Sequence, residues 1–280
     1  MRIDWAALPK AVTEQVAHRV GGSDVTPASA GDHAEVAATV AGARGKVFVK
    51  AARSDLAVRS LRYELRVSEA VSRSHSPAVE WHFEAAGWLV AGFEHCEGPH
   101  ADLSPGSSDL RLLAAALDDL GSTPAPDVRP FMPYERFGFA KPAMDGDTLV
   151  HTDLTAANLI VTRHGLRIVD WAMAAKAAPW VELAALTAWL IGAGHTPEQA
   201  EQWLAQRTAW EATDPATLTF FATSNAEKWA RKAQHSTATW THDLANWTGQ
   251  WAAYRLRFGS ARCLGTSPIR GTSRSIPPTT

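Results

Sequence analysis

Three polar side chains with an informative spacing lie within residues 149–161 of the chain. His151, Asp153 and Asn158 fit the pattern H-x-D-x-x-x-x-N. In this pattern the aspartate accepts the proton of an attacking hydroxyl, and the asparagine oxygen binds magnesium. The spacing therefore predicts phosphoryl transfer to an alcohol, with Asp153 as the catalytic base.

A second carboxylate follows at the end of a predicted hairpin. The runs 159–162 and 166–169 are apolar and strand-like, the turn between them contains Gly165, and Asp170 comes directly after the second run. Such a hairpin brings Asp170 back beside Asn158. Because magnesium prefers oxygen ligands, Asn158 and Asp170 are the candidate metal ligands. The alternative is that Asp153, Asn158 and Asp170 serve only as turn and capping residues, but the pattern and the hairpin together favour catalysis.

The elements that position these residues begin with a strand-rich region. The sequence predicts a helix over 5–18, a hairpin of 35–40 and 46–51, and strands over 79–83 and 88–93. Between the two pairs of strands, Ser54 and Asp55 mark the start of a helix that extends to about Ser72. The first part of the chain is therefore expected to be rich in β-structure.

The remainder of the chain is expected to be mainly helical. Residues 109–120 predict a helix, the apolar run 183–194 predicts a buried helix too short to span a bilayer, and eight tryptophans follow Pro179. Trp203 and Trp210, like Trp240 and Trp247, are seven residues apart. This spacing predicts that each pair lies on one helical face and packs into the core.

Composition narrows the classes of partner. The net charge is -2, from 27 basic and 29 acidic side chains, so neither nucleic acid nor a membrane surface is expected as a partner. Cys96 and Cys263 show no disulfide or metal-ligand spacing, and no secretory signal is readable. These features predict a cytoplasmic protein, and they leave its oligomeric state open.

These residues give the chain a resemblance to the aminoglycoside phosphotransferase and choline kinase-like superfamily, which has the protein-kinase-like fold. The resemblance is strongest over 151–182 and continues through Lys50, Glu64 and the segment 94–99. It implies a bilobal α+β fold with a small β-rich N-terminal lobe and a larger, mainly α-helical C-terminal lobe. The expected boundaries are 1–95 for the nucleotide-binding lobe, 96–264 for the catalytic and substrate-binding lobe, and 265–280 for a loose tail.

The resemblance also implies roles for residues outside the catalytic loop. Lys50 contacts the nucleotide phosphates and pairs with Glu64, in preference to Glu69, which lies on a different face of the same predicted helix. Glu94 and Cys96 belong to a hinge whose backbone recognises adenine.

The phosphate-covering loop is the weakest part of the resemblance. Ser29 and Gly31 are its candidates, although the segment 27–33 lacks the G-x-G-x-x-G pattern. The chain also departs from the family where Thr152 replaces a glycine, Thr155 a histidine and Glu182 an aspartate.

The expected reaction uses Mg²⁺ and ATP, or GTP, to phosphorylate a hydroxyl of an antibiotic or related metabolite. Residues 180–280 carry seven acidic and nine basic side chains. A polycationic aminoglycoside needs a more acidic pocket, so another acceptor is favoured, with a conventional aminoglycoside kept as the alternative. The alternatives are a nucleotide-binding regulatory pseudokinase, disfavoured by the intact Asp153, and a metal-dependent hydrolase, disfavoured by the absence of an H-E-x-x-H pattern.

Overall fold

The structure is a computed structural model that describes residues 3–28, 34–71, 73, 75–126 and 131–258. The candidates Ser29 and Gly31 and the predicted loose tail 265–280 lie outside these residues. The strands are β1 (Asp24–Pro27), β2 (Val36–Gly42), β3 (Gly45–Ala52), β4 (Val79–Ala85), β5 (Trp88–Glu94), β6 (Thr148–Val150), β7 (Leu159–Thr162), β8 (Gly165–Ile168) and β9 (Ala175–Ala177).

The helices of the described residues begin before the sheet and dominate after it. The α-helices are α1 (Lys10–Val20), α2 (Asp55–Ala70), α3 (Asp109–Gly121), α4 (Pro133–Phe137), α5 (Trp180–Gly192), α6 (Pro197–Leu204), α7 (Thr208–Glu211), α8 (Pro215–Ala233) and α9 (Thr239–Phe258). Single 3-10 turns are η1 (Trp5–Ala7), η2 (Pro142–Met144), η3 (Ala156–Asn158) and η4 (Trp171–Met173).

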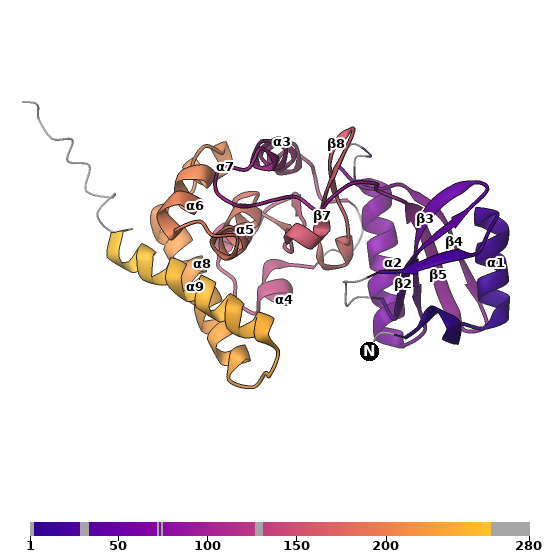
Figure 1. The fold of residues 1–280 in the computed structure, drawn as a ribbon. Coiled ribbons are helices and arrows are strands. Elements are labelled where there is room, and N and C mark those ends of the chain that lie inside the picture. Colours follow the sequence, from indigo (N-terminus) through magenta and orange to yellow (C-terminus); the bar gives the residue numbers. More distant parts are fainter. Residues whose placement is uncertain (1–2, 29–33, 72, 74, 127–130, 259–280) are drawn as a thin grey trace, which may run out of the picture.

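An antiparallel sheet with strand order β1-β2-β3-β5-β4 forms the first part of the fold. The predicted hairpin is β2 and β3, closed where Gly42 pairs with Gly45. Helix α1 covers one face of the sheet and α2 the other (Figure 1). Side chains alternate between faces along a strand. In β5, accordingly, Val90 packs with the α1 cluster and Ala91 with the α2 cluster.

The predicted helix over 5–18 is divided in two. Leu8 is extended, with ψ 142°, because the ring of Pro9 disfavours helical backbone at the residue before it. The turn η1 therefore ends at Ala7, and α1 begins only at Lys10. Val12 and Val16 of α1 are buried against the sheet.

Helix α2 belongs to both halves of the molecule. Its Leu61 and Leu65 pack against the sheet, whereas Tyr63 and Val67 join the large core of the helical part. The Tyr63 hydroxyl donates a hydrogen bond to the carbonyl of Ala174 (2.7 Å). Helix α2 therefore connects the sheet to the segment that follows β8.

The predicted buried helix is α5, most of whose residues are buried. The prediction that Trp203 and Trp210 share one helical face is wrong, because they lie on different helices, α6 and α7. Their predicted packing into the core is confirmed, since Trp210 is buried there and Trp203 packs against it. Trp240 is not a core residue, since 48% of it is exposed, whereas Trp247 packs against Trp189 of α5. Within the described part of the chain, no helix has both the length and the apolar character that a membrane span requires.

Candidate active site

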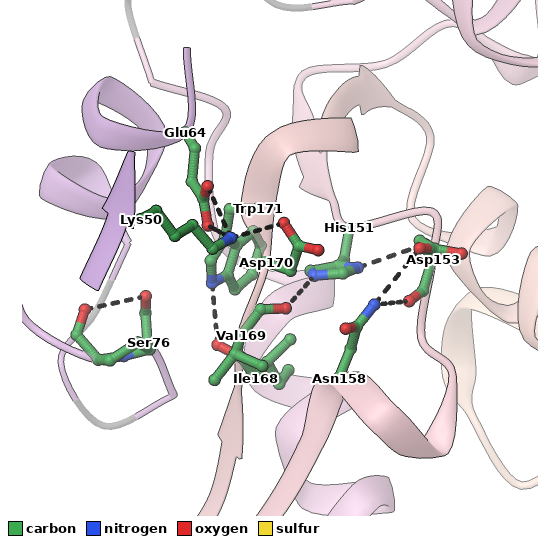
Figure 2. Close-up of polar contacts among 11 residues, drawn as sticks. Lys50, Glu64, Ser76, His151, Asp153, Asn158, Ile168, Val169, Asp170 and Trp171 are labelled. Atoms are coloured by element: carbon green, nitrogen blue, oxygen red, sulfur yellow. Dashed lines mark hydrogen bonds and ion pairs between the residues drawn. The ribbon is translucent and has the colours of Figure 1, made fainter. Parts of the chain in front are cut away.

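The predicted catalytic loop follows β6 and is anchored by a buried histidine. The Nδ1 atom of His151 accepts a hydrogen bond from the backbone N–H of Asp153 (3.3 Å), so Nε2 carries the proton and donates to the carbonyl of Val169 (2.9 Å; Figure 2). Burial lowers the pKa of His151, although the Asp153 carboxylate opposes this. The neutral ring therefore ties the loop to the residues after β8.

Asp153 and Asn158 are brought together by the turn between them. The Asn158 amide nitrogen donates to the backbone carbonyl of Asp153 (2.9 Å) and to its carboxylate (3.3 Å). These bonds use the nitrogen, so the amide oxygen is the Asn158 atom that can bind a cation.

The short hairpin of β7 and β8 returns the chain to the same place. Leu159 pairs with Ile168, and the N–H of Val169 donates to the carbonyl of Asn158 (2.9 Å). Asp170 follows with φ 65°, in the left-handed region. The hairpin therefore brings Asp170 close to Asn158, the arrangement expected from the sequence.

Lys50 connects the sheet to this hairpin. Its Nζ atom lies 2.7 Å from a carboxylate oxygen of Glu64 in α2 and 2.8 Å from one of Asp170 (Figure 2). Burial lowers the pKa of Lys50, but the two carboxylates outweigh this effect and raise it. Lys50 therefore stays positively charged. Glu69, the rival partner, is exposed.

A buried carboxylate from α5 holds the backbone of the catalytic loop. Glu182 accepts hydrogen bonds from the backbone N–H groups of His151 and Thr152, the latter at 3.0 Å. Burial raises the pKa of Glu182 to about 7, against these hydrogen bonds and the charge of Arg136. In the resemblance to the family, Glu182 was noted only because it replaces an aspartate, and no role was predicted for it.

Arg136 of α4 contacts Thr152, and this contact was not predicted from the sequence. Thr152 adopts φ 65°, where a β-branched side chain is strained. The Arg136 guanidinium donates to the Thr152 hydroxyl (2.5 Å) and carbonyl (3.2 Å), while that hydroxyl donates to the carbonyl of Met173 (2.9 Å). Arg136 therefore supports the backbone immediately before Asp153. No local spacing links residues 136 and 152, so only the fold could identify this contact.

A cavity of about 500 Å³ lies between the sheet and the catalytic loop. Four of the predicted site residues line this cavity: Lys50, Glu64, Asn158 and Asp170. Glu94 and Cys96 line it where β5 ends. Asp153 is not among the lining residues but is bonded to Asn158.

The segment after β5 packs tightly on the hairpin. Gly98 has φ 156°, and a Cβ atom there would lie 2.0 Å from the carbonyl oxygen of Val161. The N–H of Val161 donates to the carbonyl of Pro99 (2.9 Å). Burial, followed by the charge of Glu94, raises the pKa of Cys96 to about 11, so its thiol is neutral. The predicted hinge is thus attached to the β7–β8 hairpin through its backbone.

A family model matches the part of the chain that contains the predicted catalytic loop. Residues 140–218, which include the catalytic loop and α5, match the model of the phosphotransferase enzyme family APH. No curated protein sequence matches the chain significantly.

Solved structures share the fold across most of the chain. A thermostable mutant of aminoglycoside phosphotransferase APH(4)-Ia, in a ternary complex with AMP-PNP and hygromycin B, is similar with a TM-score of 0.62 and 16% identity, over 92% of this chain and 100% of that one. Choline kinase LicA from Streptococcus pneumoniae is similar with a TM-score of 0.54 and 13% identity, over 89% and 98%. The α+β protein-kinase-like fold expected from the sequence is therefore confirmed.

Proposed function

We propose that this chain, a phosphotransferase of the aminoglycoside phosphotransferase and choline kinase-like superfamily, moves the γ-phosphoryl group of ATP or GTP to a hydroxyl of an antibiotic or related metabolite. The observation that carries the proposal is the convergence of three side chains on one cavity. Lys50 comes from the sheet, Asn158 from the catalytic loop and Asp170 from the end of the hairpin. This is the combination of a phosphate-binding cation and oxygen ligands that phosphoryl transfer requires.

The proposed reaction is a direct, in-line transfer. The acceptor oxygen forms a bond to the γ-phosphorus while the bond from that phosphorus to the bridging oxygen breaks, and a nucleoside diphosphate leaves. Asp153 receives the acceptor's proton. Lys50, held by Glu64 at 2.7 Å, is positioned to contact the phosphates.

The oxygen atoms at the site fit a magnesium ion. Asp170 offers a carboxylate and Asn158 an amide oxygen, and Mg²⁺ is commonly held by one or two carboxylates together with substrate phosphates. When bound, Mg²⁺ neutralises charge on the phosphate oxygens. The left-handed backbone at Asp170 positions its carboxylate next to Lys50.

The solved relatives support the two substrate classes. Some of the similar APH(4)-Ia structures contain ADP or AMP-PNP together with hygromycin B. For this chain we propose a lobe of residues 1–95 for the nucleotide and a lobe of residues 96–264 for catalysis and the acceptor, with the cytoplasm as the site of reaction. Antibiotic resistance is a consequence only if the acceptor is an antibiotic.

Substitution of the proposed base tests the function against the pseudokinase alternative. With Mg²⁺ and ATP or GTP, and a panel of hydroxylated antibiotics and metabolites, we expect acceptor-dependent release of diphosphate and a phosphate added to the acceptor by mass spectrometry. Asp153→Asn is expected to lower kcat by roughly 100-fold or more, because a general base contributes on that order. Nucleotide affinity is expected to stay unchanged.

Asp24→Asn, an exposed substitution in β1, is the matched control and is expected to leave turnover unchanged. Wild-type turnover in Asp153→Asn would contradict the assigned role. Tight nucleotide binding without transfer to any acceptor would favour the regulatory pseudokinase.

A further inference from the structure

A positively charged side chain lies directly beside the catalytic loop. Besides its hydrogen bonds to Thr152, the Arg136 guanidinium lies near the carboxylates of Asp153 and Glu182. Burial lowers the pKa of Arg136, and the two carboxylates oppose this effect. An acceptor whose hydroxyl reaches Asp153 must therefore approach Arg136 as well.

Further cations extend from Arg136 along α8. Arg136 Cζ lies 5.6 Å, and Lys228 Nζ 5.5 Å, from the centroid of the Phe137 ring. Lys228 and Lys232 lie 5.4 Å and 4.6 Å from the Trp229 ring. Lys232 also lies 4.7 Å from the ring of Trp240, which contacts Trp229 edge to face. We call this set the basic–aromatic cluster: Arg136, Phe137, Lys228, Trp229, Lys232 and Trp240.

The fold brings the cluster together from three helices. Phe137 packs on Phe221, with ring centroids 5.2 Å apart, which fixes α4 against α8 (Figure 1). Trp240 comes from α9. The arrangement therefore depends on tertiary packing and is not a simple run of charge in the sequence.

Within the described residues, neither of the two lysines, Lys228 and Lys232, forms an ion pair, and the nearby Glu227 pairs instead with Arg231 (3.8 Å). Burial, followed by the charges of Arg136 and Lys232, lowers the pKa of Lys228 to about 8. An anion bound between these groups would relieve their mutual repulsion.

We infer that the acceptor is a hydroxylated anion, whose carboxylate or phosphate group binds Lys228 and Lys232 while its hydroxyl lies at Asp153. This inference rests on the proposed function and names the chemistry of its acceptor. The rings of Trp229 and Trp240 offer flat apolar surface to the body of the acceptor. A polycationic aminosugar is disfavoured because it would meet like charges at all three basic side chains.

Matched acceptors that differ in charge test the inference. One such set consists of glucuronate, glucuronamide and glucosamine. Glucose 6-phosphate adds an acceptor with a phosphate group, and further hydroxylated acids are each compared with their amides. We expect the wild type to transfer phosphate to acids with kcat/KM at least about tenfold above that for the amides. Lys228→Gln is expected to reduce kcat/KM for the acids by about tenfold and to leave the amides little changed.

Two further variants separate a binding effect from a folding effect. Lys232→Gln alters an exposed side chain and is expected to show the same selective loss, whereas Lys10→Gln, an exposed change in α1, is expected to show none. Saturation-transfer NMR with glucose 6-phosphate gives a binding readout that needs no turnover, and its signal is expected to weaken in both α8 variants.

The results separate this inference from the function on which it rests. Asp153-dependent transfer with equal or better use of amides or amines would overturn the anionic acceptor and keep the kinase. Equal losses for acids and amides in Lys228→Gln and Lys232→Gln would also overturn it. Absence of transfer to every acceptor, despite nucleotide binding, would count against the proposed function, and the inference would fall with it.

Discussion

At the scale of single residues, the site depends on a buried cation shared by two carboxylates. Only 7% of Lys50 is exposed, yet it stays charged because Glu64 and Asp170 both lie within 2.8 Å of Nζ. Glu64 fixes the lysine from α2, and Asp170 joins it to the hairpin. The proposed phosphate-binding cation and a candidate magnesium ligand are thereby positioned together.

Removal of Asp170 is expected to weaken binding of the magnesium nucleotide. Asp170→Ala deletes a candidate metal ligand, so the Kd for Mg-ATP is expected to rise by at least about tenfold, while the Kd for metal-free nucleotide changes little. Nucleotide titrations with and without Mg²⁺ measure both values. Asp153→Asn is the comparison, because it should affect turnover and not this Kd. Unchanged Mg-ATP affinity in Asp170→Ala would rule out the ligand role.

At the scale of secondary-structure elements, the catalytic loop is held in a strained conformation by its neighbours. A left-handed backbone at a residue such as Thr152 costs about 1–3 kcal/mol. The hydrogen bonds from Arg136 in α4 and to Glu182 in α5 offset this cost. A threonine can therefore occupy a position where the family usually has glycine.

The protonation of Glu182 predicts a pH dependence of stability. Its pKa is raised from 4.5 to about 7 in the folded protein, so folding favours the protonated form. The resulting stabilisation is complete below about pH 4.5 and is lost as pH rises through about 7. The contribution of Glu182 to the free energy of unfolding is therefore expected to fall by up to about 3 kcal/mol over this range.

Urea unfolding at a series of pH values measures this dependence. Glu182→Gln, which cannot ionise, is expected to show a smaller decrease than the wild type between pH 5 and 8. Glu198→Gln, an exposed change in α6, serves as the control and should follow the wild type. Identical pH profiles for Glu182→Gln and the wild type would exclude Glu182 as the source.

At the scale of the whole molecule, α9 is fastened to the helical part through a buried ion pair. Arg255 donates to Glu201 of α6 (2.7 Å) and to the carbonyl of Pro215 (2.9 Å). The indole N–H of Trp251 donates to the same Glu201 carboxylate (2.8 Å). Because α9 also carries Trp240, this anchor helps to position the basic–aromatic cluster.

Disruption of the pair is expected to destabilise the protein. Arg255→Met leaves the Glu201 carboxylate buried without its cation, which is expected to lower the free energy of unfolding by about 3–5 kcal/mol. Chemical denaturation measures this change. The double variant Arg255→Met/Glu201→Met should recover part of the loss, because no buried charge remains unpaired. Arg257→Met, an exposed change on the same helix, is the control, and an equal loss there would contradict the argument.

Local patterns in the sequence determined most of the elements and the candidate chemistry. The spacing of His151, Asp153 and Asn158 and the apolar runs after them placed a loop and a hairpin correctly, because strand alternation and turn residues act over a few positions. The same reasoning placed Lys50 on a strand and Glu64 on the following helix. Short-range physics was sufficient for these features.

Contacts between distant segments were decided only by the tertiary structure. Lys50 and Asp170 meet across 120 residues, and Arg136 reaches Thr152 from a separate helix. The seven-residue spacing of Trp203 and Trp210 wrongly predicted a shared helical face, because the chain turns between α6 and α7. The basic–aromatic cluster likewise exists only because α4, α8 and α9 pack together. Such contacts are selected by the packing of whole elements, and spacing along the chain carries no information about that packing.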